Sequence, residues 1–397
     1  MTLERFHLEL KELLYIEDEG MVNIILASIV ANSLKLGDPV WLTLIGPSSG
    51  GKSQIIRPFA KAHPELIHRV DDLTPNTLIS GSLGMEHSML GRIGPHAILS
   101  MDDLTVLFSK NVEARGEILS QFRMLYDGRF SKSSGNRKED MLWEGYLGMI
   151  SGSTPSIYRY FAEVADMGER FVSYRMKSFD KHKALDFITA HQSTAKNLDE
   201  RIADLIGSFL KPLLADPLLL APHTVLSPST KDTISHISEH CTLLRTPVHV
   251  DDRSGFVDEF PEPEMPFRVM KQLTYLAQGL QALNQGPLTE QLTHSLEWVG
   301  WSLANDKRRA YLKALSIIDY QNKSITAKNV SAITGLHRDI VKKGMAQFQA
   351  LGIITLKGDD QGEYVWKLTA PELNKIALRL DPPNLEYNLK LDYGTTE

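Results

Sequence analysis

The sequence contains very little cysteine and no long apolar segment. Its 397 residues include one cysteine, Cys241, which excludes both a disulfide framework and a cysteine-rich zinc site. No apolar run approaches the roughly 20 residues of a membrane span. The N-terminal stretch MTLERFHLELKELL is charged where a signal peptide would be apolar. We therefore expect a cytoplasmic protein with no membrane-bound part.

The sequence also lacks an excess of positive charge, internal repeats and low-complexity segments. A net charge of −6 argues against a chain that coats nucleic acid over its whole surface, although it allows local basic patches. A hydrophobic content of 42% and a charged content of 23% are typical of globular proteins. At this length, two or three domains are expected.

The most informative stretch, VWLTLIGPSSGGKSQ at 40–54, joins an apolar run to a glycine-rich loop and an expected helix. It has the spacing G-x-x-x-x-G-K-S, in which backbone N–H groups surround phosphate oxygens, Lys52 reaches the β- and γ-phosphates, and Ser53 binds Mg²⁺. A glycine-rich turn before a surface helix is the alternative. The strand before the loop and the helix after it favour a nucleotide site. Its predicted binding residues are Gly46, Pro47, Ser48, Ser49, Gly50, Gly51, Lys52, Ser53 and Gln54.

A second motif, HAILSMDDLT at 96–105, places two carboxylates after an apolar strand. Ligands of open α/β sheets bind at the carboxyl ends of strands. We expect Asp102 to hold Mg²⁺ and Asp103 to polarise the attacking water. Asp103 is one methylene shorter than the more usual glutamate, so its role as a base is less secure. A strand that ends in a solvated acidic turn is the alternative.

Two further segments follow the same alternation of strand and polar end. In YLGMISGSTPSIY at 146–158, Thr154 is expected to contact the water or the γ-phosphate. In MGERFVSYRM at 167–176, Arg170 is expected in a loop from which it could reach a neighbouring subunit's nucleotide. Arg175 competes for that role.

An ion pair of Arg170 with Glu169 or Asp166 on the surface is the structural alternative to the role in a neighbouring subunit.

The alternation of apolar runs and helical stretches from 40 to about 177 predicts a parallel α/β sheet. Strands are expected near 40–45, 66–70, 97–101, 146–151 and 171–176. The predicted divisions are N-terminal helices at 1–36, a P-loop core at 37–180, a helical region at 181–306, a small domain at 307–370 and a loosely held tail at 371–397.

The four motifs, in this order, resemble the AAA+ ATPases, most closely the minichromosome-maintenance branch and its relatives in phages and mobile elements. The resemblance implies an α/β P-loop core with a parallel sheet flanked by helices, an all-α lid, ATP and Mg²⁺ as cofactors, and a homo-oligomeric ring, most often a hexamer. GPSSGGKS corresponds to Walker A, LSMDD to Walker B and GERF to the arginine finger. Thr154 stands where the branch usually has asparagine, so its first sensor is altered. The resemblance makes Arg268, in a helix expected at 262–283, the second-sensor residue.

The same branch inserts two hairpins that face the central pore. Residues 126–145 lie between the second and third motifs and carry four cations, Arg129, Lys132, Arg137 and Lys138. A cationic hairpin of this kind would hold DNA phosphates, whereas a solvated loop is the alternative. The other insertion would fall at 77–94. Residues 1–36 are too short for the family's N-terminal oligonucleotide-binding domain, so DNA loading would have to differ.

The segment 307–369 has a helix–helix–helix–hairpin pattern that resembles a winged helix. Thr326 is the expected N-cap of the second helix, and Gly335 ends it. Residues 307–345 hold nine basic residues against Asp319 and Asp339: Lys307, Arg308, Arg309, Lys313, Lys323, Lys328, Arg338, Lys342 and Lys343. This reversal of charge is typical of a phosphate-binding face, with His337, Arg338, Lys342 and Lys343 as expected DNA contacts. Winged helices also dock proteins, which is the alternative.

Three functions are compatible with these motifs. The first is a ring-forming DNA motor, either a replicative helicase or an initiator from a phage or mobile element, with replication or element-encoded proteins as partners. The second is an AAA+ switch, such as a helicase loader, a transposition regulator or a defence ATPase. The third, a small-molecule P-loop kinase, does not need a long helical lid or a basic winged helix.

Overall fold

The computed structural model describes residues 1–79, 85–133, 140–160, 170–191, 197–216, 220–251, 257, 261–358 and 364–369. The chain splits into two compact units, Met1–Ile234 with Met270–Val299 and Ser235–Val269 with Gly300–Glu397. The five-part division and the tail at 371–397 stay predictions, and the tail lies outside the described residues.

The first unit is built on a five-stranded sheet in which all neighbouring strands are parallel. The strand order is β2-β3-β6-β1-β7. The bounds are β1 Trp41–Ile45, β2 Ile67–Arg69, β3 His96–Met101, β6 Tyr146–Ser153 and β7 Phe171–Arg175. All five strands form where the sequence predicts them, which confirms the α/β core.

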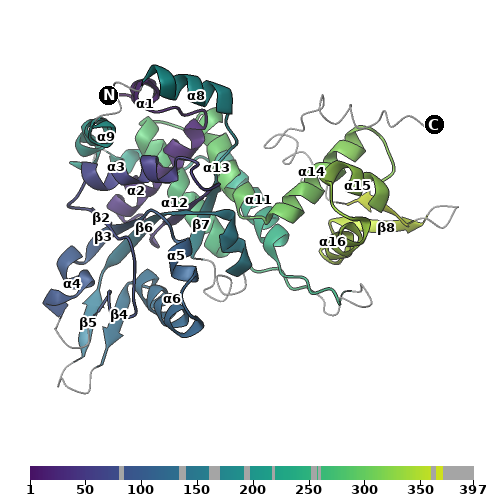
Figure 1. Cartoon of the computed structure of the whole chain (residues 1–397), viewed down its shortest axis with the longest axis horizontal. Helices are drawn as coiled ribbons and strands as arrows, with labels where there is room; N and C mark the ends of the chain where they lie inside the picture. The colour runs from purple at the N-terminus through teal and green to yellow at the C-terminus, as the bar shows by residue number, and fades with distance from the viewer. Residues whose placement is uncertain are drawn as a thin grey trace. The chain divides into compact units, whose positions relative to one another are not determined.

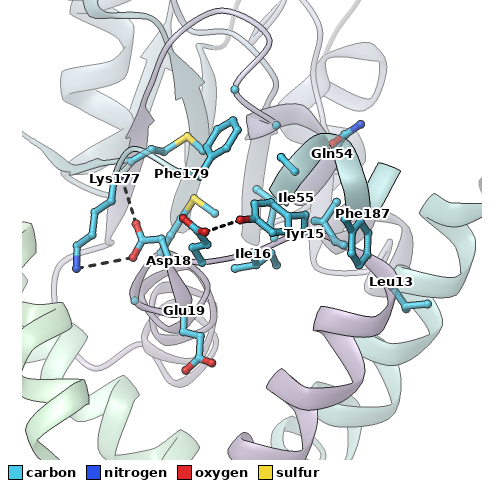
Figure 2. A pocket seen from close by; sticks show the side chains of 18 of the residues that line it. Leu13, Tyr15, Ile16, Asp18, Glu19, Gln54, Ile55, Lys177, Phe179 and Phe187 are labelled. Atoms are coloured by element: carbon cyan, nitrogen blue, oxygen red, sulfur yellow. Dashed lines mark hydrogen bonds and ion pairs between the residues drawn. The ribbon is translucent and has the colours of Figure 1, made fainter. Parts of the chain in front are cut away.

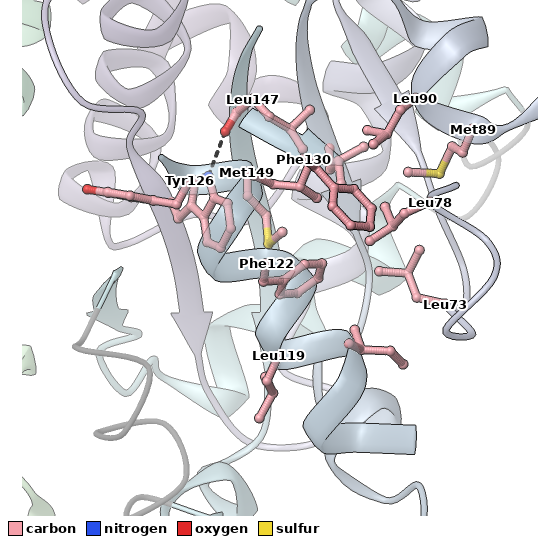
Figure 3. Packing of buried hydrophobic residues seen from close by; sticks show 14 of the residues in the cluster. Leu73, Leu78, Met89, Leu90, Leu119, Phe122, Tyr126, Phe130, Leu147 and Met149 are labelled. Carbon is pink, nitrogen blue, oxygen red and sulfur yellow. Dashed lines mark hydrogen bonds between the residues drawn. The ribbon is translucent and has the colours of Figure 1, made fainter. Parts of the chain in front are cut away.

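Helices cover both faces of this sheet (Figure 1). One face is covered by α2 (Glu19–Leu34) and α3 (Lys52–Ala62), and α2 approaches so closely that a Cβ on Gly148 would meet the Asn32 side chain at 2.5 Å. On the other face, α6 (Val112–Tyr126) packs Phe122 against the Trp41 ring, with 5.4 Å between ring centroids (Figure 3). The apolar strand residues thus alternate between two cores, and this buries β1 completely.

Helix α2 ties the start of β1 to the N-terminal region. The Asn32 side chain accepts a hydrogen bond from the Val40 N–H at 2.8 Å and donates one to the Val40 carbonyl at 2.9 Å. Buried polar groups require such partners. The two bonds therefore fix the strand that leads into the glycine-rich loop.

The other elements of the first unit surround the sheet or connect its strands. Besides α2, α3 and α6, the described helices that lie wholly in this unit are α1 Leu3–Leu13, α4 Met89–Ile93, α5 Thr105–Phe108, α8 Lys181–Ala190 and α9 Leu198–Leu214, with 3-10 turns at Met85–His87, Pro155–Tyr160 and Ala221–Thr224. Helices α11 Pro228–Arg245, α12 Phe267–Asn284 and α13 Glu290–Ser302 each contribute residues to both units. No helix in the described ranges combines the length and the apolar character of a bilayer span.

A hairpin of β4 (Arg129–Lys132) and β5 (Met141–Glu144) lies between the second and third motifs. The side chains of Phe130, Met141 and Trp143 are buried in the core shown in Figure 3, and the Trp143 indole donates to the Gly94 carbonyl at 3.1 Å. The alternate residues face solvent. The base of the predicted insertion is therefore an anchored hairpin, whereas the described part of the second predicted insertion, at 77–94, includes the 3-10 turn Met85–His87 and α4.

The second unit carries three consecutive helices and a two-stranded hairpin. Their bounds are α14 Asp306–Tyr320, α15 Ala327–Thr334, α16 Arg338–Ala350, β8 Ile354–Gly358 and β9 Tyr364–Leu368. Thr326 caps α15 through its side chain, and Gly335 ends it with a φ of 70°. A bridge joins Ile325 to Trp366 of β9. The cap and the turn confirm the sequence predictions.

The prediction that Arg308 belongs to an exposed basic face is wrong. Its side chain is 4% exposed, and its guanidinium donates to the carbonyls of Leu244 and Thr246 at 2.8 and 2.6 Å. Burial lowers the pKa of this guanidinium to about 10, which still leaves it charged at neutral pH. Arg308 therefore holds the second unit together internally and offers no charge to a phosphate backbone.

Replacing Arg308 by alanine should lower the free energy of unfolding by about 3 kcal/mol, because two buried carbonyls lose their donor. Chemical denaturation followed by circular dichroism measures this change. Lys307→Ala, one residue away and exposed, is the matched control and should change stability by less than about 0.5 kcal/mol. Unchanged stability together with weakened DNA binding in Arg308→Ala would restore Arg308 to the basic face.

Candidate nucleotide and metal site

The glycine-rich loop leaves β1 at its carboxyl end and enters α3 at Lys52. Ser49 and Gly51 both have positive φ, 61° and 84°, and the Gly50 N–H donates to the Pro47 carbonyl at 3.1 Å. Turns of this hand direct successive backbone N–H groups toward one point. No side chain among the described residues caps the start of α3. The first N–H groups of the helix are therefore available to an anion.

Lys52 lies inside this loop. Its side chain is 7% exposed, and its ammonium donates to the carbonyls of Gly46 and Pro47 at 2.9 and 2.7 Å. Burial lowers the pKa of Lys52, and the nearby Asp103 carboxylate opposes that shift. The loop thus holds a cation close to the second motif, and its contact with nucleotide phosphates stays a prediction.

The second and third motifs lie at the same edge of the sheet as the loop. The strand β6 lies between β1 and β3. The Ser153 carbonyl of β6 accepts from the Gly46 N–H at 3.1 Å, and the Gly152 carbonyl accepts from the Leu104 N–H at 2.7 Å. The end of β6 therefore connects the glycine-rich loop to the segment that carries both aspartates.

Asp103 is fixed by the residue that opens α5. One carboxylate oxygen, Oδ1, accepts from the Thr105 N–H at 2.9 Å and also from the Thr105 hydroxyl. Both bonds use one oxygen, and no hydrogen bond to the other oxygen is found within the described part of the chain, so a water molecule could bind there. This arrangement is compatible with the expected role of Asp103 in polarising water.

The two carboxylate oxygens of Asp102 differ in their hydrogen-bond partners. Oδ2 accepts from Arg57 Nε at 2.6 Å and from Arg69 Nη2 at 3.1 Å. Oδ1 is buried and has no hydrogen-bond partner in the part of the chain that the structure describes. A buried carboxylate oxygen without a donor is what a cation would satisfy.

These residues fit a Mg²⁺ ion that arrives with a nucleotide. Mg²⁺ is commonly held by one or two protein oxygens together with substrate phosphates. Asp102 and the partly buried Ser53, in the first turn of α3, supply such oxygens. The described residues contain no group of three or more His, Cys, Asp or Glu side chains that could hold a metal ion by themselves.

Thr154 follows β6 directly and so lies at the same sheet edge. Its hydroxyl shares a hydrogen bond of 2.6 Å with the Ser156 hydroxyl. The structure thus brings together Lys52, the aspartate pair and Thr154 from three strands.

A cavity of about 680 Å³ opens beside the loop, and we call it the P-loop cavity (Figure 2). Its walls come from the loop residues Ser49–Gly51, the segment 12–21, residues after β7 and the start of α13. The Tyr15 ring lies 6.0 Å from the Phe187 ring and 6.3 Å from the Phe179 ring, centroid to centroid. An apolar, aromatic cavity of this size is typical of a small-molecule site.

The opposite wall of the P-loop cavity is polar. The Lys177 ammonium lies 3.3 Å from His294 Nε2, 4.0 Å from Asp18 Oδ1 and 4.7 Å from the Trp298 ring centroid. Gln54, an expected binding residue, also lines the cavity. The cavity therefore offers an aromatic wall and a charged wall next to the phosphate loop.

Arg170 lies at the amino ends of the strands, whereas the glycine-rich loop of the same chain lies at their carboxyl ends. It precedes Phe171, which pairs with Trp41 at the start of β1, and five strand residues span roughly 15 Å. Its guanidinium donates to both oxygens of Asp127 at 3.2 and 3.1 Å and lies over the Tyr126 ring. Arg170 thus pairs with Asp127, and the two acids that the sequence suggested, Asp166 and Glu169, lie outside the described residues. A role for Arg170 in a neighbouring subunit stays a prediction.

The two other arginines considered for the site differ in position. Arg175 ends β7 opposite Ile45, beside the loop, and donates to the Tyr158 hydroxyl. Arg268 lies in the first turn of α12 within the second unit, and its role as a second sensor stays a prediction.

The expected DNA contacts are divided between the two units. In the hairpin, Arg129 is exposed and lies 3.7 Å from the Glu144 carboxylate, whereas Lys132 donates to Asn76 at 2.9 Å. Arg137 and Lys138 lie outside the described residues.

In the second unit, Arg338 and Lys342 are exposed on α16, Lys343 is half-buried, and His337 is the N-cap of that helix. Three of the four residues expected to contact DNA, His337, Arg338 and Lys342, are thus exposed, and their contact with DNA stays a prediction.

Sequence reasoning missed the arginine pair on Asp102 and the walls of the P-loop cavity. Arg57 follows Ser53 by four residues, which places both on one face of α3, and that spacing was the available signal. Tyr15, Phe187 and His294 come from segments that no motif links to the loop.

No protein-family model matches the chain, and no curated protein sequence is significantly similar to it. The relationship to AAA+ ATPases is therefore a resemblance in motifs and their order.

Proposed function

We propose that the protein is an ATP-hydrolysing DNA motor of the AAA+ type, a ring-forming replicative helicase or initiator of a phage or mobile element. The observation that carries this proposal is the convergence, at one edge of a parallel sheet, of the phosphate loop, the aspartate pair and Thr154. An acidic turn or a glycine-rich turn with only a structural role would not require these groups to meet.

The chemistry follows from the positions of these groups. A water molecule next to Asp103 attacks the γ-phosphorus, the bond from the γ-phosphorus to the bridging oxygen breaks, and the water's proton passes to the carboxylate. Lys52 and the N–H groups of the loop stabilise the charge on the phosphate oxygens. When bound by Ser53 and Asp102, Mg²⁺ would neutralise further charge on the same oxygens.

The P-loop cavity supports a nucleoside triphosphate as the substrate. A base and ribose would lie in the cavity when the phosphates occupy the loop, because Ser49–Gly51 belong to both. Tyr15, Phe179 and Phe187 line the cavity, and stacking on an aromatic ring is a common way to hold a flat base.

Two features support coupling of this site to DNA. The β4–β5 hairpin extends from the core between the aspartates and Thr154, and its exposed face carries Arg129. In the second unit, the order α14–α15–α16 and β8–β9 supports a winged helix, with α16 as the element for the major groove. Lys343 of α16 is half-buried and Arg308 of α14 is buried, so we assign DNA affinity mainly to Arg338, Lys342 and the hairpin.

The proposal predicts that the purified protein hydrolyses ATP with Mg²⁺, that single-stranded DNA stimulates hydrolysis, and that a forked duplex is unwound. Phosphate release and a fluorescent-strand assay measure the two activities. The absence of ATP hydrolysis with or without DNA would overturn the proposal.

Hydrolysis without unwinding would instead support the second function, an AAA+ switch. DNA-stimulated hydrolysis together with ATP-dependent assembly into rings or filaments, and no strand separation, would identify a switch such as a helicase loader, a transposition regulator or a defence ATPase. Mass photometry with and without DNA distinguishes these assemblies.

A further inference from the structure

Two arginines outside every motif lie on the proposed metal ligand. Arg57 projects from α3, four residues after Ser53 and therefore on the same helix face. Arg69 ends β2, whose neighbour β3 leads directly into Asp102. Both positions belong to regular elements packed into the core, so both guanidiniums start from rigid backbone.

The two arginines contact only one oxygen of Asp102. Arg57 Nε and Arg69 Nη2 both donate to Oδ2, at 2.6 and 3.1 Å, whereas Oδ1 is buried without a partner among the described residues. Two charge-assisted hydrogen bonds from different directions fix the plane of a carboxylate. Oδ1 is thereby held in one orientation.

We propose that Arg57 and Arg69 are positioning residues that present Oδ1 of Asp102 to the Mg²⁺ ion. This inference rests on the proposed nucleotide site. Arg57 is the more important of the two, because its bond to Asp102 is shorter and because Arg69 also pairs with Asp71 at 2.8 Å. Groups that orient a metal ligand in this way typically contribute 10- to 100-fold to metal affinity or activity.

Electrostatic repulsion between the two arginines and Mg²⁺ lowers the affinity for Mg²⁺ and so opposes the benefit of orienting Asp102. The side chains of Arg57 and Arg69 are 44% and 43% exposed and line a second cavity of about 820 Å³. Water therefore screens their charge on the outer side. The short bonds to a carboxylate that is only 15% exposed are screened less, so orientation outweighs repulsion.

The test measures equilibrium binding of a fluorescent ATP analogue, in EDTA and across a Mg²⁺ titration. Arg57→Ala should leave the Kd in EDTA within about 2-fold of the wild-type value and should raise the Mg²⁺ concentration at the midpoint by about 10-fold. Arg57→Lys keeps the charge without the rigid guanidinium and should restore the midpoint only in part.

Lys61→Ala is the matched control, since Lys61 lies one turn further along the same helix, is 49% exposed and pairs with Asp199. Its midpoint should match that of the wild type. Melting temperatures of all variants report folding independently.

Three results would overturn the inference: an unchanged midpoint in Arg57→Ala, a midpoint at lower Mg²⁺, or full restoration by lysine. If the wild-type protein itself binds no nucleotide, the proposed function fails. Nucleotide binding by the wild type with an unchanged midpoint in Arg57→Ala removes only the positioning role.

Discussion

Replacing Lys52 by alanine should lower the rate of ATP hydrolysis by at least about 100-fold, the typical effect of removing one preorganised donor to developing charge. The Lys52 ammonium is almost fully buried in the glycine-rich loop and lies near Asp103. No other lysine takes part in the loop geometry among the described residues. Steady-state release of phosphate measures the effect, with DNA both present and absent.

The control for this change must remove a lysine charge from the same helix while leaving the loop intact. Lys61→Ala removes a lysine from the same helix and should retain the wild-type rate within about 2-fold, because an exposed ion pair contributes little. A Lys52→Ala protein that hydrolyses ATP at a near wild-type rate would contradict the assignment of the loop as the catalytic phosphate site.

Asp103→Asn should lower kcat by about 100-fold or more, the contribution expected of a general base, while the Kd for ATP with Mg²⁺ stays within about 3-fold. Asparagine keeps an Oδ1 that can accept from the Thr105 N–H and hydroxyl, so α5 should still begin at the same residue. Only the negative charge and the ability to take a proton are lost. Parallel measurements of turnover and nucleotide affinity separate these effects.

A nearby acid outside the site serves as the comparison. Asp72→Asn removes the carboxylate that pairs with Lys110 on the surface, 52% exposed, and should leave kcat unchanged. Equal loss of kcat and of nucleotide affinity in Asp103→Asn would show that Asp103 has a structural or binding role and would reassign the base to another group.

Local sequence was sufficient to predict the elements whose structure depends on residues nearby in the chain. The apolar runs at 40–45 and 97–101 predicted β1 and β3 because a strand buried on both faces is apolar along its length. The cap at Thr326 and the turn at Gly335 were predictable because both are set by bonds within a few residues.

Side chains that act across the fold were not predictable in the same way. Arg308 was counted with the exposed cations, because charge and helical spacing do not reveal which face meets carbonyls more than 60 residues earlier. For Arg170, the alternative to a role in a neighbouring subunit was an ion pair with Glu169 or Asp166, and the structure shows an ion pair with Asp127, 43 residues away. In both cases the partner is set by packing of distant segments.

The sequence by itself determined the glycine-rich loop between a strand and a helix, the aspartate pair after a strand, and the parallel sheet, because each is encoded by a contiguous run of residues with its own periodicity or spacing. Only the tertiary structure decided that Arg57 and Arg69 meet on one oxygen of Asp102, and that residues 12–21, the loop and α13 enclose a cavity. These groups come from separate segments, and the chain brings them together only when the helices pack on the sheet.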